Sequence, residues 1–188
     1  TISSTTNERN SKFNVIVNNE NATLNITGGN LYKDELGSIV ENSGILNITG
    51  GLLKGTISGY NKLYLVSTTS TGKTTITGGT YEGDGWNYGG VCVLLNQGVT
   101  NVTGINITSQ MYGMKNEGEG ILSLTDVSMD NIKFSAISNE NGTVIINSGT
   151  FISQDYNGQR VGTIENSGGT VNVISGSFSG SYYGIYQS

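Results

Sequence analysis

The chain has 188 residues with 29 Gly, no Pro, no His and a single Cys, and its formal net charge is −5. These numbers exclude a disulfide framework, a Cys/His zinc site and any catalysis that needs a His base, so we expect no metal and no cofactor. The nine basic residues are spread along the chain, which argues against a nucleic-acid partner, and no apolar run is long enough to insert into a membrane as a helix.

Residues 1–12 carry no repeat, and we interpret them as an N-terminal cap or linker. Along residues 13–188 an alternating segment recurs seven times, most clearly as Leu-Asn-Ile-Thr-Gly-Gly at residues 24–29 and 46–51. Alternation with a period of two predicts a strand, and a unit of 22 to 28 residues built from short strands predicts one turn of a solenoid. The central apolar residues, which we call the anchors, are Ile26, Ile48, Ile76, Val102, Leu124, Ile146 and Val173.

Two further positions recur between the anchors. Five residues after each anchor comes a large apolar residue: Leu31, Leu53, Tyr81, Ile107, Met129, Phe151 and Phe178. Later in each unit comes an apolar residue, any residue, and then Asn, which predicts a structural ladder of stacked Asn side chains. Its members are Asn18, Asn42, Asn96, Asn116, Asn139 and Asn166, with Thr68 and Gln187 at the same place in two units.

The recurrent Asn-Ile-Thr-Gly-Gly and Ile-x-Asn-x-Gly strings resemble the right-handed parallel β-helix repeats of bacterial cell-surface, adhesin-like proteins. The predicted fold class is therefore all-β, a right-handed parallel β-helix of about seven to eight turns. In such a stack nearly every backbone N–H donates to the next turn, which explains the absence of Pro. Gly pairs after the anchors, such as Gly28-Gly29, are predicted to make the bends.

The connection from this large apolar residue to the first residue of the following apolar-x-Asn motif varies in length. It takes 13 steps in three units and 7 to 9 in the others. The long connections place aromatic rings beside amide and charged side chains, which suits a sugar or a protein partner. The candidate ligand-binding residues are Tyr60, Asn61, Asp84, Trp86, Asn87, Tyr88, Tyr156, Asn157 and Arg160. In the alternative interpretation, these rings only cover their own loops.

The hypothesis we favour is a non-enzymatic adhesin module, part of a longer extracellular protein with neighbouring domains, that presents a loop-rich face to a host glycan or glycoprotein. The resemblance also admits a polysaccharide lyase or glycoside hydrolase, for which the acidic candidates are Glu82, Asp84 and Asp155. A passive stalk is a third possibility, and ice binding through the outward Asn and Thr side chains is a fourth. We predict no catalytic residue, and we expect Cys92 to be a packed thiol.

Overall fold

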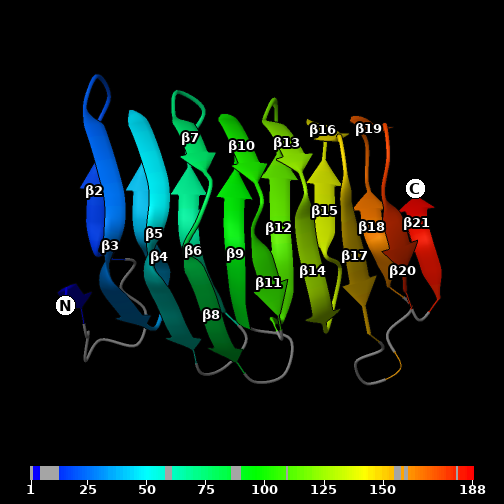
Figure 1. Cartoon of the computed structure of the whole chain (residues 1–188), viewed down its shortest axis with the longest axis horizontal. Helices are drawn as coiled ribbons and strands as arrows, with labels where there is room; N and C mark the ends of the chain where they lie inside the picture. Colours follow the sequence, from blue (N-terminus) through cyan, green and yellow to red (C-terminus); the bar gives the residue numbers. More distant parts are fainter. Residues whose placement is uncertain are drawn as a thin grey trace.

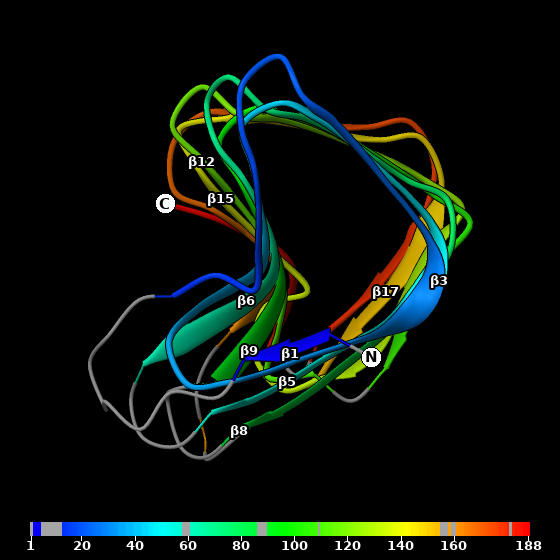
Figure 2. The same ribbon diagram turned by 90° about the vertical axis from the view of Figure 1, so that its left-hand side faces the viewer.

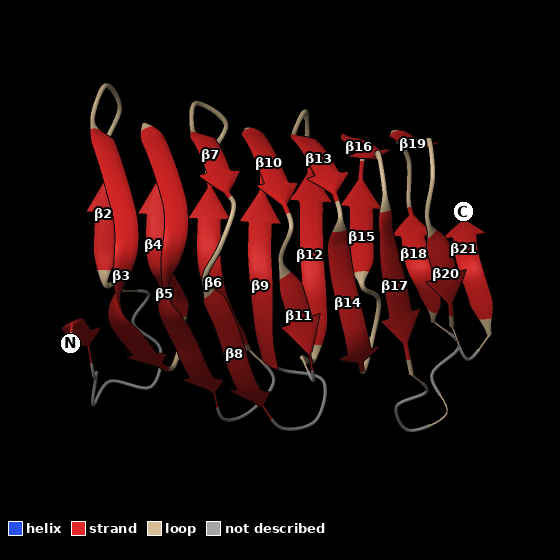
Figure 3. Ribbon diagram, viewed as in Figure 1, coloured by secondary structure: helices blue, strands red, loops and turns tan. Residues whose placement is uncertain are grey.

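The computed structural model describes residues 2–4, 13–57, 61–85, 90–108, 110–154, 158, 161–180 and 182–188. In this part of the chain every regular element is a β-strand and none is a helix (Figure 3). The strands lie across the long axis of a rod, whose two ends carry the two termini (Figure 1). The predicted fold is confirmed: the chain is a parallel β-solenoid of about seven turns.

Three parallel sheets form the sides of the rod. The eight-stranded sheet contains β2 (Ile16–Asn18), β4 (Gly37–Asn42), β6 (Lys62–Thr68), β9 (Gly90–Asn96), β12 (Tyr112–Glu117), β15 (Ile137–Glu140), β18 (Gly162–Asn166) and β21 (Tyr183–Gln187). The nine-stranded sheet contains β1 (Ile2–Ser4), β3 (Thr23–Asp34), β5 (Ile45–Ile57), β7 (Lys73–Ile76), β8 (Thr80–Gly85), β10 (Val99–Thr103), β13 (Ile121–Thr125), β16 (Thr143–Ile146) and β19 (Thr170–Val173). The four-stranded sheet contains β11 (Asn106–Thr108), β14 (Val127–Ile132), β17 (Gly149–Ser153) and β20 (Ser177–Ser179).

The solenoid is right-handed, as predicted. Seen from the N-terminal end, the chain runs clockwise as it recedes from the viewer (Figure 2). From the region predicted to be a cap or linker, the structure describes Ile2–Ser4, which pairs in parallel with β3.

The repeat positions stack into the columns that the sequence predicts. The seven anchors pair one with the next from Ile26 to Val173. The large apolar residues five positions after the anchors form a second column, in which Phe151 stacks on Phe178 with ring centroids 5.3 Å apart. Most members of these columns are fully buried, and the last turn is the exception, because Val173 is 42% exposed and Phe178 is only partly buried.

Glycines allow the bend after the anchor in the first three turns. Gly29, Gly51 and Gly79 have φ angles of 89°, 99° and 101°, in the region that residues with a side chain rarely adopt. The bends therefore need Gly at these positions, as the Gly-Gly pairs predict.

The Asn column forms two buried runs of stacked amides, one on each side of Thr68. Asn18 Nδ2 donates to Asn42 Oδ1 at 2.7 Å, and the amides from Asn96 to Asn166 are joined in the same way at 2.7 to 2.8 Å. The same amide groups also donate to turn carbonyls, such as Gly120 O at 2.9 Å from Asn116 Nδ2. The ladder thus satisfies buried groups of the side chains and of the turn backbone together.

Three threonines bridge the one internal turn that lacks Asn. Asn42 Nδ2 donates to Thr74 Oγ1 at 3.0 Å, and the Thr74 and Thr68 hydroxyl oxygens lie 2.7 Å apart. Thr100 Oγ1 lies 3.3 Å from Thr68 Oγ1 and donates to Asn96 Oδ1 at 2.7 Å. Thr74 and Thr100 occupy the column that Leu46 and Leu122 fill in neighbouring turns, so two polar residues enter an apolar column where Asn is missing.

The eight-stranded sheet is bent inward, which makes its outer surface concave (Figure 2). At the bend two consecutive side chains point into the core, as Leu65 and Val66 do in β6, and both are fully buried. The pairing of β4 with β6 likewise skips one residue, from Ser38↔Tyr64 to Val40↔Val66. The outward side chains on either side of the bend, such as Tyr64 and Ser67, therefore face a shared hollow.

Candidate ligand-binding groove

The concave outer surface of the eight-stranded sheet holds two neighbouring cavities, which together we call the groove. The wide cavity has a volume of about 530 Å³ and the narrow cavity about 170 Å³, and Lys62 lines both. Besides Lys62, the polar lining of the wide cavity comes from Asn14, Ser38, Glu41, Asn61, Tyr64, Ser67, Thr69 and Gln97. The polar lining of the narrow cavity comes from Cys92, Tyr112, Lys115, Ser135, Ser138, Glu140 and Glu165.

Strand register explains why residues far apart in the chain meet in the groove. Tyr64, Cys92 and Tyr112 are cross-strand partners before the bend, and Lys115 and Ser138 are partners after it. Each turn therefore contributes one outward side chain on each side of the bend. A ligand lying along the groove would cross several turns of the solenoid.

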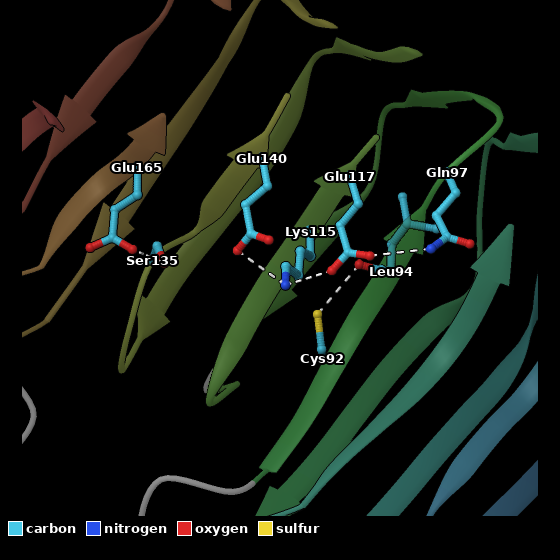
Figure 4. A network of polar contacts seen from close by, with 8 residues as sticks. All are labelled: Cys92, Leu94, Gln97, Lys115, Glu117, Ser135, Glu140 and Glu165. Carbon is cyan, nitrogen blue, oxygen red and sulfur yellow. Dashed lines mark hydrogen bonds and ion pairs between the residues drawn. The ribbon is translucent and has the colours of Figure 1, made fainter. Parts of the chain in front are cut away.

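Lys115 and Glu140, which both line the narrow cavity, belong to an ion cluster (Figure 4). Lys115 Nζ lies 2.5 Å from Glu117 Oε1 and 3.1 Å from Glu140 Oε1, and Gln97 Nε2 donates to Glu117 Oε2 at 3.2 Å. Burial lowers the pKa of Lys115, but the hydrogen bonds and charges of the two carboxylates outweigh it, so the pKa is raised above its ordinary value. Lys115 is therefore a protonated cation shared by two carboxylates.

Glu165 lies in the next turn beyond this cluster (Figure 4). Its Oε2 accepts a hydrogen bond from Ser135 Oγ at 3.1 Å, and its Oε1 accepts one from the backbone N–H of Gly162 at 3.4 Å. Both donors are neutral, so they position the carboxylate without compensating its charge.

Two tyrosines line the groove in different ways. The Lys62 ammonium lies 4.1 Å from the centroid of the Tyr112 ring, which also stacks on Phe134 at 4.7 Å. One face of a ring cannot hold both groups, so Lys62 and Phe134 cover opposite faces of Tyr112. Tyr64 lines the wide cavity, and burial raises its pKa to about 12. The phenol of Tyr64 is therefore protonated at neutral pH.

Cys92 lies at the floor of the narrow cavity and is only 2% exposed. Its Sγ lies 3.3 Å from the carbonyl oxygens of both Leu94 and Gly113, and burial raises its thiol pKa to about 11. This is a packed thiol, as the sequence predicts, since the reactive thiolate form is disfavoured.

Most of the predicted ligand-binding residues lie outside the described residues, namely Tyr60, Trp86, Asn87, Tyr88, Tyr156, Asn157 and Arg160. Of the two that are described, Asn61 lines the wide cavity. Asp84 is exposed on β8, beside the Lys54–Glu82 ion pair of 2.9 Å, and lines a different, shallow hollow. The structure thus brings Asn61 to the groove and places Asp84 elsewhere.

The repeat pattern did not predict Lys62, Tyr64, Lys115 or Glu165 as groove residues. A signal for two of them exists, because Lys115 and Glu165 are the variable middle residues of apolar-x-Asn motifs, and Glu41 holds the same place. Charged residues at one recurrent outward position could have indicated a functional surface.

No family model, curated protein or solved structure matches the chain. Within the described ranges, no three or more Asp, Glu, Cys or His side chains are grouped to hold a metal ion. The same ranges contain no helix with the length and apolar character needed to cross a membrane. The case for a function therefore depends on the groove.

Proposed function

We propose that this chain is a non-enzymatic binding module of an extracellular bacterial surface protein, and that it holds a host glycan, free or on a glycoprotein, in the groove. The observation that carries the proposal is the groove itself, two neighbouring cavities lined by amides, hydroxyls, carboxylates and two tyrosine rings. Sugars are recognised by such a mixture, because hydroxyls take hydrogen bonds while C–H faces pack on aromatic rings. The surface location rests on the resemblance of the repeat.

The state of the groove side chains favours binding over lyase chemistry. A lyase needs a base that takes a proton from the sugar ring, and a Lys or Tyr serves as that base only when its pKa is lowered toward neutral pH. The pKa values of Lys115 and Tyr64 are instead raised, so both side chains hold their protons. Glu140 and Glu165 both line the narrow cavity, so glycoside hydrolysis by a carboxylate pair is the alternative to test.

A glycan array with the intact chain tests the proposal. We expect Tyr64→Ala to weaken binding of the retained glycans by about tenfold or more, because a ring and a hydroxyl leave the wide cavity. Tyr64→Phe keeps the ring and should lose less. Thr75→Ala, on the outer face of the nine-stranded sheet, is the control and should bind as the parent does.

Three outcomes would contradict parts of the proposal. An array that retains no glycan or glycoprotein would favour the passive stalk. Shortened products from a bound oligosaccharide would favour the hydrolase. Full binding by Tyr64→Ala combined with loss in Trp86→Ala or Tyr88→Ala would move the site from the groove to the loop.

A further inference from the structure

The groove carries an excess of negative charge. Three carboxylates line it, from Glu41, Glu140 and Glu165, against the two ammonium groups of Lys62 and Lys115, and a fourth carboxylate, that of Glu117, is paired with Lys115. A ligand that brings a positive charge is therefore favoured over one that brings a negative charge.

Among the carboxylates that line the narrow cavity, Glu165 is the one without an ion pair. The Lys115 ammonium is held between Glu117 and Glu140, and the Lys62 ammonium lies over the ring of Tyr112. Among the described residues, no Lys or Arg nitrogen lies within ion-pair distance of Glu165, which accepts hydrogen bonds only from a hydroxyl and a backbone amide.

We infer that the narrow cavity is a subsite for a protonated amino group on the bound sugar, with Glu165 as its counter-charge. An ammonium group has three N–H donors. The cavity offers them the Glu165 carboxylate and the hydroxyls of Ser135 and Ser138 as acceptors. The inference rests on the proposed function and adds its substrate class: a glycan that contains an amino sugar with a free amine.

The opposite assignment, an acidic sugar held by the lysines, fits the contacts less well. Lys115 already shares its charge between two carboxylates, and an incoming carboxylate would lie beside Glu140 and Glu165 in the same small cavity. With Glu117, three carboxylates then stand against two ammonium groups, so a further carboxylate adds to the excess negative charge while an ammonium group reduces it.

Matched oligosaccharides test the inference. Glucosamine and galactosamine oligomers are compared with their N-acetylated forms on the intact chain at about pH 6, where carboxylates are ionised. We expect the free-amine forms to bind about tenfold more tightly, as one charge-assisted hydrogen bond provides. Glu165→Gln should remove this preference while binding of the N-acetylated forms is kept. Glu119→Gln, in an exposed turn, is the matched control and should keep the preference.

The outcomes separate this inference from the proposed function. If glycans bind but both forms bind equally, or the N-acetylated forms bind better, the amine subsite is wrong and the groove proposal stands. A preference that survives in Glu165→Gln also overturns the subsite. If no oligosaccharide of either form binds, and the array retains no other glycan, both proposals fail.

Discussion

At the scale of the single residue, the feature least expected from the sequence is a charged side chain in the core. Lys33 lies on β3 two residues after Leu31, so it is on the same, inward face of the strand. It is only 3% exposed, and its ammonium has no hydrogen-bond partner. Burial lowers its pKa, while the charges of Asp34 and Glu35 partly oppose that shift. An unpaired buried ammonium opposes folding, because the charge loses its contacts with water and gains few polar contacts in the protein to replace them.

We predict that Lys33→Met stabilises the protein by about 1 to 2 kcal/mol at neutral pH, since the apolar side chain removes the buried charge. The pH dependence has a definite sign. Because the folded pKa lies below the ordinary 10.5, the unfolded chain binds more protons between these two values, so parental stability rises with pH through that interval. Urea unfolding at a series of pH values measures both effects.

The control for this prediction is Lys73→Met, which replaces an exposed lysine and should change the free energy of unfolding by less than about 0.5 kcal/mol. Destabilisation by Lys33→Met, or a pH dependence identical to that of the parent, would contradict a desolvated Lys33.

At the scale of the element, the Asn ladder joins turns that otherwise meet through backbone bonds and apolar contacts. Asn116 takes part in four described side-chain bonds: it accepts from Asn96, and it donates to Asn139 and to the carbonyls of Gly120 and Thr143. Removing one amide from a buried stack leaves its neighbours unsatisfied, and such a loss costs more than the net value of one hydrogen bond.

Asn116→Ala is therefore expected to lower the free energy of unfolding by about 2 to 4 kcal/mol. The chain offers a matched control in Asn47, whose Nδ2 donates to Asn25 Oδ1 at 2.8 Å on the outer surface. Asn47→Ala should cost less than about 1 kcal/mol, because water replaces the lost partner. Equal costs in denaturant unfolding would show that burial does not govern the value of the ladder.

The threonine bridge gives a second prediction for the same ladder. Thr68→Asn alone and the pair Thr74→Leu with Thr100→Leu should each destabilise, because each change leaves buried hydroxyls or the Asn42 amide without a partner. Combined, they restore the Asn and Leu arrangement of the neighbouring turns. The triple variant should exceed the additive expectation by about 1 kcal/mol or more, measured as a coupling energy. Additive effects would mean that the three hydroxyls do not act together.

The sequence predicted the columns better than it predicted the groove. Anchors and ladder could be aligned because each repeats once per turn, and a one-residue slip would reverse inside and outside. The threonine bridge was not predicted, since Thr74 and Thr100 read as polar exceptions until Thr68 lies beside them. The groove was not predicted because Leu65 and Val66 both point inward, which breaks the alternation that assigns outward residues.

At the scale of the whole molecule, stability and binding surface are both built by adding turns. In a solenoid each turn contacts mainly its neighbours, so total stability is approximately a sum of the turns and the interfaces between them. The pairing shows where one turn could be removed without a change of register. Thr103 and Thr125 are partners, and so are Val102 and Leu124, which makes residues 103–124 one complete turn.

We predict that a variant lacking residues 103–124 still folds as a parallel β-solenoid. Val102 would be followed by Thr125 at an equivalent position, and Asn96 would face Asn139, because both now bond to Asn116. The urea m-value should fall by about a tenth, in proportion to the surface lost, and the melting temperature should fall with the lost interface. Far-UV circular dichroism should keep the strand signal per residue. Loss of that signal, or unfolding in two separate steps, would show that the turns are not interchangeable units.

The deletion also removes Tyr112 and Lys115 from the narrow cavity and leaves Tyr64 and Glu41 in the wide one. A shortened rod that folds should therefore retain the wide half of the groove.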